Sequence, residues 1–171
     1  METVLILDFG AQYSQLIARR VREQNVYCEV KPCSISPAEI EKIAPIGIIL
    51  SGGPQSVYES VSLRVDPALF ALGIPVLGIC YGCQLMAYSL GGTVAAATEA
   101  TAREYGKTLT EFDTHSAIFQ DLPASSVTWM SHGDYISRVP DGFTVTAKTA
   151  VCPTAAMACP EKRLYGVQFH P

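Results

Sequence analysis

The stretch Pro75-Val-Leu-Gly-Ile-Cys-Tyr-Gly-Cys-Gln-Leu-Met-Ala-Tyr-Ser-Leu-Gly-Gly92 decides the fold that we predict for this chain. Its first part, Val76 to Ile79, is short and apolar and follows a proline, which is typical of a buried strand. Its last part, Gln84 to Leu90, contains good helix formers and ends at a glycine pair, as helices commonly do. The sequence therefore predicts a strand that turns directly into a helix.

The turn between these two elements has a cysteine framed by glycines, Gly78-Ile-Cys80-Tyr-Gly82. A sharp strand-to-helix turn brings the backbone close to its neighbours, so glycines are expected on both sides. Such a turn would hold Cys80 at the top of the sheet, with its sulfur at a helix N-terminus whose dipole favours the thiolate. This arrangement is the sulfur version of a nucleophile elbow.

Two other interpretations of Cys80 stay open at this point. Most cysteines in strand-like runs are small core hydrophobes. Cys83 lies three residues further on, and a C-x-x-C pair is also typical of thioredoxin-like redox sites. We favour the nucleophile, because redox pairs usually open a helix without this glycine frame. Cys83, one turn into the helix, is more simply a packing residue.

Composition excludes several classes of protein. A length of 171 residues suits one domain with a full core, and a charged fraction of only 16% suggests a sheet covered on both faces. A net charge of −4 without a basic run argues against a nucleic-acid surface. No apolar run is long enough to span a membrane, and no signal peptide is visible. We therefore expect a cytoplasmic protein with six reduced cysteines and, since only Cys80 and Cys83 have zinc-like spacing, no metal site.

The first half of the chain alternates between strands and helices. Strands are predicted at 4–7, 27–30, 47–51 and 76–79, and helices at 14–24, 37–43, 67–72 and 84–90. Ser36 and Glu39 form a capping box around Pro37, and Asp66-Pro67 marks another helix start. This alternation predicts an α/β fold with an open, mostly parallel sheet, helices on both faces and flavodoxin-like layering.

The second half has almost no helical periodicity. Strands are predicted at 93–97, 107–111, 127–130, 144–147, 154–158 and 164–169, and the five residues 159–163 suit a hairpin. We therefore expect an antiparallel extension in the C-terminal half, whose final strands bring the chain back towards the active centre.

Ligands of open α/β sheets bind beyond the carboxyl ends of the strands. There, a cysteine that attacks a carbonyl needs an oxyanion hole, most easily built from backbone N–H groups. Gly52 and Gly53 would let the backbone approach a substrate, and the N–H of Tyr81 is a second natural donor. Alone, Gly52-Gly53-Pro54 is more often an ordinary turn, but its place after the strand expected beside the elbow favours the oxyanion role. No dinucleotide or P-loop motif is present.

A cysteine nucleophile also needs a base, and the chain has three histidines. His115 lies in a polar stretch and is expected on a surface loop. His132 and His170 each follow a predicted strand, so either could be the base. A lone histidine at a strand end is, however, more often a structural hydrogen-bonding residue.

Several motifs together resemble one known family, the class I (triad) glutamine amidotransferases. They are Gly78–Gln84, Ser51–Pro54 and Gly166–Pro171. Four further stretches resemble the glutaminase domains of the GMP synthase branch: Leu5–Tyr13, Ala18–Glu23, Ile48–Pro54 and Trp129–Asp134. The resemblance covers nearly the whole chain. It implies hydrolysis of glutamine to glutamate and ammonia, with the ammonia used by a synthetase domain that aminates XMP to GMP with ATP.

The resemblance also implies a role for each site residue. Cys80 would attack the side-chain amide of glutamine, and His170 would be the base and later the acid. The N–H groups of Gly53 and Tyr81 would hold the oxyanion. The remaining residues would bind the substrate, with His132 shaping the loop: Gly52, Gln84, Ser131, His132, Gly133 and Asp134.

Two departures from the family pattern matter. The family motif continues with a glutamate that orients the histidine, whereas this sequence stops at Pro171, so we expect residues 1–171 to be the glutaminase domain of a longer protein. The isolated chain would then be weakly active or inactive. Cys83 stands where a methionine is expected, which we interpret as a neutral packing change.

The resemblance implies these partners: glutamine, a synthetase domain on the same or a partner chain, and a second copy in a homodimer of the full-length protein. No cofactor is expected in this domain, and ATP and magnesium would bind the synthetase domain. Two alternatives stay open. One is an amidotransferase serving another synthetase, such as those for anthranilate, carbamoyl phosphate or CTP. The other is a non-catalytic glutamine-binding partner domain.

Overall fold

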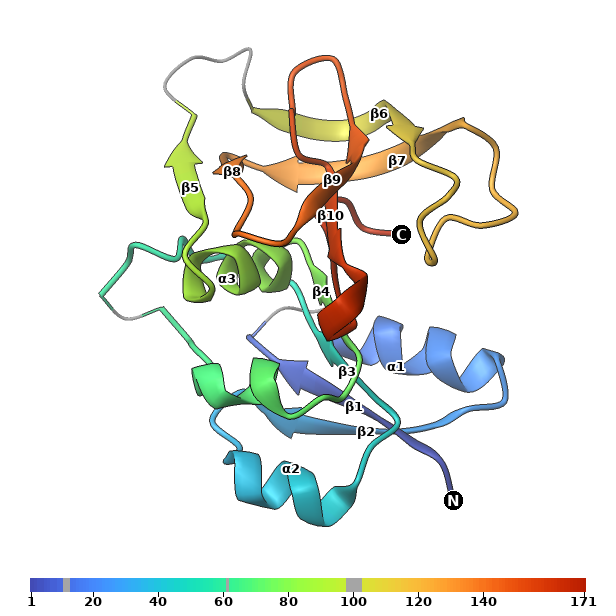
Figure 1. The fold of residues 1–171 in the computed structure, drawn as a ribbon, viewed down its shortest axis with the longest axis vertical. Helices are drawn as coiled ribbons and strands as arrows, with labels where there is room; N and C mark the ends of the chain where they lie inside the picture. Colours follow the sequence, from blue (N-terminus) through green and yellow to red (C-terminus); the bar gives the residue numbers. More distant parts are fainter. Residues whose placement is uncertain (11–12, 61, 98–102) are drawn as a thin grey trace.

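The computed structural model describes residues 1–10, 13–60, 62–97 and 103–171. Its main sheet has nine strands in the order β2-β1-β3-β4-β11-β10-β9-β6-β7 (Figure 1). The strands of the parallel half are β1 (Thr3–Asp8), β2 (Tyr27–Pro32), β3 (Gly47–Leu50), β4 (Val76–Ile79) and β11 (Leu164–Val167). Those of the antiparallel half are β10 (Ala156–Cys159), β9 (Thr144–Lys148), β6 (Glu104–Phe112) and β7 (Ser125–His132). The predicted α/β fold with an antiparallel C-terminal part is confirmed.

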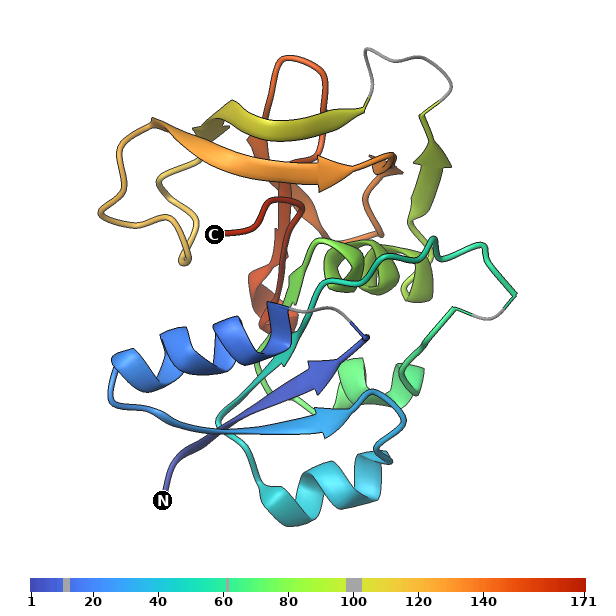
Figure 2. The same ribbon diagram turned by 180° about the vertical axis from the view of Figure 1, so that it is seen from behind.

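Helices cover both faces of the parallel half, as predicted. Alternation along β1 directs Leu5 and Leu7 to one face and Ile6 to the other. On the Ile6 side, α1 (Tyr13–Glu23) packs its buried Ala18. The opposite face carries α2 (Pro37–Ile43), the 3₁₀ helix η1 (Pro67–Ala71) and α3 (Tyr81–Ser89). Figure 2 shows the α1 side.

Local signals placed the short helices well. Ser36 Oγ accepts the Glu39 N–H at 3.2 Å, and the Glu39 carboxylate accepts the Ser36 N–H at 3.0 Å, so the capping box is formed. Asp66 caps η1 through the Ala68 N–H at 3.0 Å. The third predicted start was wrong by three residues, because α3 begins at Tyr81, immediately after the elbow.

The antiparallel half departs further from the prediction. A small second sheet pairs β5 (Thr93–Ala96) with β8 (Asp134–Arg138), a strand that was not predicted. β8 has charged residues at both ends and one fully buried side chain, Ile136, so its apolar pattern is weak. β7 was predicted to end at 130 but extends to His132, which therefore ends the strand and does not follow it. Its partner β6 begins at Glu104 and not at 107, and the pair Glu104↔His132 closes the ladder.

The last strand joins the two halves. β10 and β11 form the predicted hairpin, closed by the 3₁₀ helix η3 (Pro160–Lys162). β11 then pairs in parallel with β4, with Val167 opposite Ile79, the residue before Cys80. β11 ends at Val167, two residues before the predicted end. The following residues turn under β7, where His170 N–H donates to Trp129 O at 2.9 Å. The end of the chain thus returns to the elbow.

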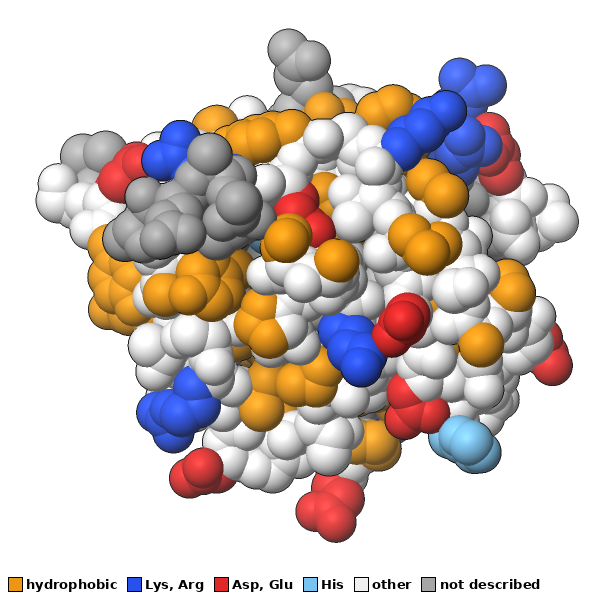
Figure 3. Space-filling model, turned by 90° about the horizontal axis from the view of Figure 1, so that it is seen from above, with side chains coloured by type: hydrophobic (Ala, Val, Ile, Leu, Met, Phe, Trp, Pro, Cys, Tyr) orange, Lys and Arg blue, Asp and Glu red, His pale blue; other side chains and the backbone are white. Residues whose placement is uncertain are grey.

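Figure 3 shows the molecule from above, with apolar side chains in several places between charged side chains of both signs. Exposed apolar side chains of β6 and β7 include Leu109, Val127 and Trp129. Among the described residues, none of the helices combines the length and the apolar character that spanning a membrane requires.

Candidate active site

A cleft of about 570 Å³ opens at the carboxyl ends of the central parallel strands. It is lined by Gly10, Tyr13, Gly53, Pro54, Gln55, Ser56, Cys80, Tyr81, Gln84, Tyr105, Ser131, His132, Gly133, Asp134 and His170. All of the predicted site residues except Gly52 line this cleft. Ala11 and Gln12, which belong to one of the motifs noted in the sequence, lie outside the described residues.

The elbow has the strained geometry that its sequence predicts. Cys80 has φ 54° and ψ −109°, a conformation that L-residues rarely adopt. A Cβ added at Gly78 would lie 2.6 Å from Gly82 O, and one added at Gly82 would lie 2.5 Å from Leu50 O. Close backbone contact therefore requires both glycines, and the residue with the strained backbone conformation is Cys80.

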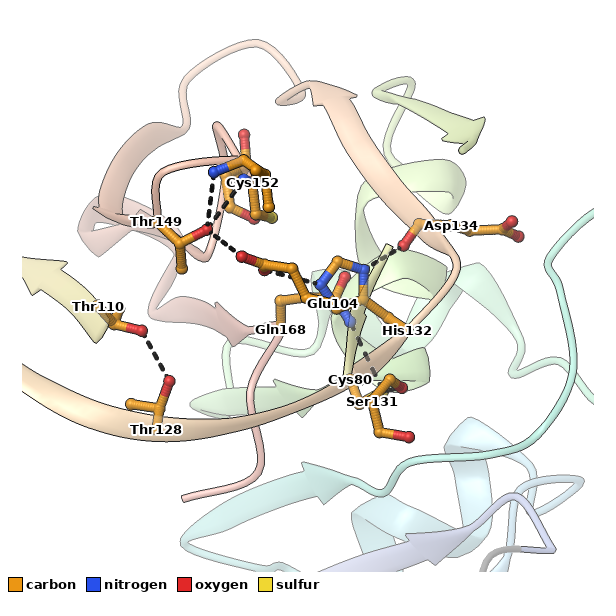
Figure 4. A network of polar contacts seen from close by, with 12 residues as sticks. Cys80, Glu104, Thr110, Thr128, Ser131, His132, Asp134, Thr149, Cys152 and Gln168 are labelled. Atoms are coloured by element: carbon orange, nitrogen blue, oxygen red, sulfur yellow. Dashed lines mark hydrogen bonds and ion pairs between the residues drawn. The ribbon is translucent and has the colours of Figure 1, made fainter. Parts of the chain in front are cut away.

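The Cys80 thiol is buried in a polar niche. Its Sγ donates to Ser131 O at 3.7 Å and accepts from Gln168 Nε2 at 3.6 Å (Figure 4). Burial raises the pKa of the Cys80 thiol to about 11, although hydrogen bonds from the Tyr81 N–H and the Gln168 amide act in the opposite direction. The expectation of a thiolate favoured by the helix N-terminus is thus not met, because burial outweighs the donors. At neutral pH this thiol is protonated and needs a base.

His170 lies beside the nucleophile. A Cβ added at Gly52 would be 3.2 Å from His170 Cε1 and 3.7 Å from Cys80 Cβ, so the Gly52 backbone lies against both residues. The imidazole also packs on Tyr13, with 4.8 Å between ring centroids. Burial lowers the pKa of His170. The ring is therefore neutral at pH 7 and able to accept a proton.

The other two histidines are occupied elsewhere. His132 is buried, and its Nδ1 donates to Asp134 O at 2.8 Å while its Nε2 lies 3.2 Å from Glu104 Oε2. Both of its ring nitrogens are therefore held by the protein. His115 is exposed on a loop, as predicted, and pairs with Asp113 at 3.1 Å. Of the two histidines that the sequence left open, His170 is the one with a ring available to Cys80.

Gly53 and Tyr81, the two predicted oxyanion donors, both line the cleft. Tyr81 is the first residue of α3, and the first intrahelical bond runs from Gln84 N to Cys80 O. The N–H groups of the first turn are therefore free of helical acceptors. Gly53 packs tightly against the same region, because a Cβ there would lie 3.2 Å from Phe9 O and 3.4 Å from Tyr81 Cδ1.

The side-chain amide of Gln84, on α3, bonds to the opposite wall of the cleft. Gln84 Nε2 donates to Asp134 O at 3.0 Å and to Gln168 Oε1 at 2.9 Å. Through these bonds Gln84 fixes the segment Ser131–Asp134 across from Cys80. Its nitrogen is thus committed to protein acceptors, so Gln84 shapes the cleft as well as lining it.

Sequence reasoning missed two buried residues near the site. Gln168, fully buried, contacts the nucleophile directly. It lies inside the motif Gly166–Pro171, in which the family resemblance assigns a role only to the histidine. Glu104 is also buried and contacts His132. No sequence signal marks Glu104, because its partner is 28 residues away.

The same region contains a set of metal-compatible side chains. Glu104, His132 and Cys152 each place one possible ligand atom within 4.8 Å of the others. These residue types suit zinc. In the structure, however, Glu104 and His132 bond each other, and the Cys152 thiol donates to Thr154 O at 3.3 Å. Burial also raises the pKa of Cys152 to about 12. The polar atoms are thus satisfied by the protein itself.

Cys83 behaves as a packing residue. It is fully buried, and its Sγ lies 2.5 Å from the point where a Cβ on Gly166 would be placed. Burial raises the pKa of its thiol strongly. All six cysteines, Cys80 and Cys83 among them, are free thiols. Nothing in this geometry favours a redox pair.

Comparisons with known proteins match the chain to one family. The family model "Glutamine amidotransferase class-I" matches residues 5–171. The chain is 55% identical over 170 residues to a GMP synthase [glutamine-hydrolyzing] from Clostridium botulinum and 56% identical to one from Bacillus pumilus. Each match covers 99% of this chain and 33% of the relative, so the chain spans about a third of these curated relatives.

Solved structures show the same fold. A putative GMP synthase protein from Thermoplasma acidophilum superposes with a TM-score of 0.84 at 30% identity, covering all of this chain and 84% of that one. A glutamine amidotransferase from Thermotoga maritima gives a TM-score of 0.79 at 22% identity, covering 99% and 75% of the two chains, which supports the fold alone. The family model, the first of these structures and the cleft described above all indicate the same family. The chain belongs to the class-I glutamine amidotransferases.

Proposed function

We propose that this chain hydrolyses glutamine to glutamate and ammonia through a thioester on Cys80. The observation that carries the proposal is the cleft, whose lining includes a thiol on a strained elbow, a neutral imidazole, and the residues Gly53 and Tyr81. Each of these groups has a task in breaking an amide, and they meet where α/β folds bind substrates.

The chemistry follows from the protonation states. His170 takes the proton of the Cys80 thiol, and the sulfur attacks the side-chain carbonyl carbon of glutamine. The N–H groups of Gly53 and Tyr81 hold the negative oxygen of the tetrahedral adduct. His170 returns its proton to the amide nitrogen, and the C–N bond breaks to release ammonia. A water molecule, deprotonated by His170, then attacks the thioester, which releases glutamate and regenerates the thiol.

The resting contacts of the thiol give the first step a physical cost. A carbonyl can only accept a hydrogen bond, so Ser131 O favours the protonated sulfur and disfavours the thiolate. The Gln168 amide and the Tyr81 N–H favour the thiolate. Proton transfer to His170 therefore requires the sulfur to lose its bond to Ser131 and keep its donors.

We further propose that the ammonia serves a synthetase that aminates XMP to GMP with ATP and magnesium. The support is the 55–58% identity, over 99% of this chain, to relatives named GMP synthase [glutamine-hydrolyzing]. Because the chain spans a third of those relatives, the synthetase would lie on further residues of the same protein or on a partner chain. No cofactor is proposed for residues 1–171 themselves. A cytoplasmic location, consistent with six free thiols, and a homodimer of the full-length protein belong to the same proposal.

The test uses the complete protein with its synthetase present. We expect glutamate release, and covalent labelling of Cys80 by a glutamine analogue that carries an electrophilic carbon. Cys80→Ala should reduce glutamate release by at least about 10³-fold, because the nucleophile is lost, while synthesis from added ammonia persists. Binding of glutamine without any turnover would instead support the non-catalytic partner domain. Ammonia-dependent formation of a product other than GMP would identify another synthetase.

A further inference from the structure

We propose that Glu104 is a positioning residue, which acts through a buried hydrogen bond to His132 and so holds the segment Ser131–Asp134 against the Cys80 thiol. The inference rests on the proposed glutaminase function and adds a residue to it. Nothing in the sequence motifs marks Glu104, and it does not line the cleft.

The buried pair is fixed from both ends. Glu104 and His132 are 6% and 5% exposed, and Glu104 Oε2 lies 3.2 Å from His132 Nε2. On the carboxylate side, Thr149 Oγ1 donates to Glu104 Oε1 at 2.5 Å, and the same hydroxyl accepts the N–H of Cys152 at 2.9 Å. Figure 4 shows these bonds in series, from Cys152 through Thr149 and Glu104 to His132.

The hydrogen bonds of the His132 ring determine which of its nitrogens carries a proton. Asp134 O can only accept, so His132 Nδ1 carries a proton. The contact of Nε2 with Glu104 Oε2 is the second hydrogen bond of the ring. Because both groups are buried, removing one partner leaves the other unsatisfied, which is far more costly than losing an exposed pair.

The pair is linked to the nucleophile through a short piece of backbone. His132 and Gln84 both donate to Asp134 O, and three residues earlier Ser131 O accepts from Cys80 Sγ. Gln84 also donates to Gln168, which donates to Cys80 Sγ. The network therefore forms a closed ring that includes this segment. The β6 backbone pairs with the segment at Tyr105↔Ser131, and the Glu104 side chain adds a buried bond from β6 to the His132 ring.

The test measures glutamine hydrolysis and ammonia-dependent synthesis in the complete protein. We expect Glu104→Leu to lower kcat/KM for glutamine by about 10²-fold, as misplaced catalytic groups do, with ammonia-dependent synthesis unchanged. Glu104→Gln keeps the length and both hydrogen bonds, since its amide donates to His132 and its oxygen accepts from Thr149, and should restore kcat/KM to within about threefold. The control is Glu111→Gln, on the same strand in an exposed pair with Lys148, which should match the wild type.

A second readout distinguishes positioning from general stability. The rate at which iodoacetamide alkylates Cys80, followed by peptide mass mapping, should change in Glu104→Leu and return in Glu104→Gln. Should the leucine variant fail to fold, Thr149→Val removes only the hydroxyl that holds the carboxylate, and we expect it to lower kcat/KM for glutamine about three- to tenfold.

The two levels of the proposal fail in different ways. A folded Glu104→Leu protein, or a Thr149→Val protein, with wild-type kcat and KM for glutamine would overturn the positioning role. A wild-type protein that releases no glutamate would instead refute the proposed function.

Discussion

The two halves of the sheet contribute to the site in different ways. The parallel half presents the groups that can react. Cys80 follows the end of β4, and His170 lies shortly after β11. The antiparallel half presents the segment Ser131–Asp134, which faces the thiol with a carbonyl and is supported by a buried polar network. One half is therefore equipped for bond making, and the other for holding and aligning what is bound.

This division has a structural reason. In the parallel half, strand ends and helix starts converge at one edge, so a nucleophile and its N–H donors can come from one continuous turn. Antiparallel strands have no such edge, and β6 and β7 instead bring together side chains far apart in sequence, such as Glu104 and His132. We therefore expect changes in the parallel half to reduce kcat, and changes in the antiparallel half to act through substrate alignment.

The substitution with the largest expected effect is Gly52→Ala, in the parallel half. The added Cβ would lie 3.2 Å from His170 Cε1, so the imidazole must shift, whereas its 3.7 Å distance to Cys80 Cβ is an ordinary contact. We expect kcat for glutamine to fall by about 10²-fold, with the fold retained. Steady-state kinetics with glutamine and with ammonia would check this. If only KM rose, the assignment of the reacting groups to the parallel half would be wrong.

The pH dependence of kcat/KM for glutamine tests whether His170, in the parallel half, carries the proton transfer. Burial lowers the pKa of His170 below its usual value of 6.5, so this ring stays neutral until the pH falls below that value. We expect kcat/KM for glutamine to be maintained at pH 6.5 and to decline about tenfold per unit once His170 is protonated. Its unfolded form binds the proton more readily, so acid also lowers stability. An acid limb centred above 6.5 would contradict this assignment.

The parallel half was also the more predictable half. Apolar runs such as Val76–Ile79 are buried on both faces, so hydrophobicity alone reveals them, and the flanking glycines Gly78 and Gly82 mark the close contact. Capping residues then place the helices within a residue or two, as at Ser36. The same local pattern favours Cys80 as a nucleophile over a core or redox cysteine.

The antiparallel half hides its contribution for a physical reason. Glu104 and His132 are polar residues on inward-facing strand positions, so they interrupt the apolar alternation that reveals a strand. Their burial depends on each other, and no local rule connects residues 28 positions apart. Gln168 was overlooked for a related reason, since its contact with Cys80 exists only once β11 pairs with β4.

A stability measurement tests the close packing at the elbow. Gly82→Ala would place a Cβ 2.5 Å from Leu50 O, a backbone atom that cannot move aside cheaply. We expect the free energy of unfolding to fall by at least about 1–3 kcal/mol, measured by chemical denaturation. The control is Gly47→Ala on β3, where the nearest atom, Pro75 O, is 3.8 Å from the new Cβ. Equal losses in both variants would show that the elbow tolerates a side chain.

The smallest expected effect separates the two cysteines of α3. Cys83 is one turn after Cys80, but it is fully buried and packs against Gly166 on β11, away from the cleft. Cys83→Ala removes its thiol without adding volume, so we expect kcat and KM for glutamine to stay within about twofold of wild type while stability falls modestly. Cys83→Ser should likewise preserve turnover, with a larger loss of stability because a hydroxyl is buried. A marked loss of turnover in both variants, under reducing conditions, would mean that the second thiol takes part in the chemistry and that packing alone does not explain it.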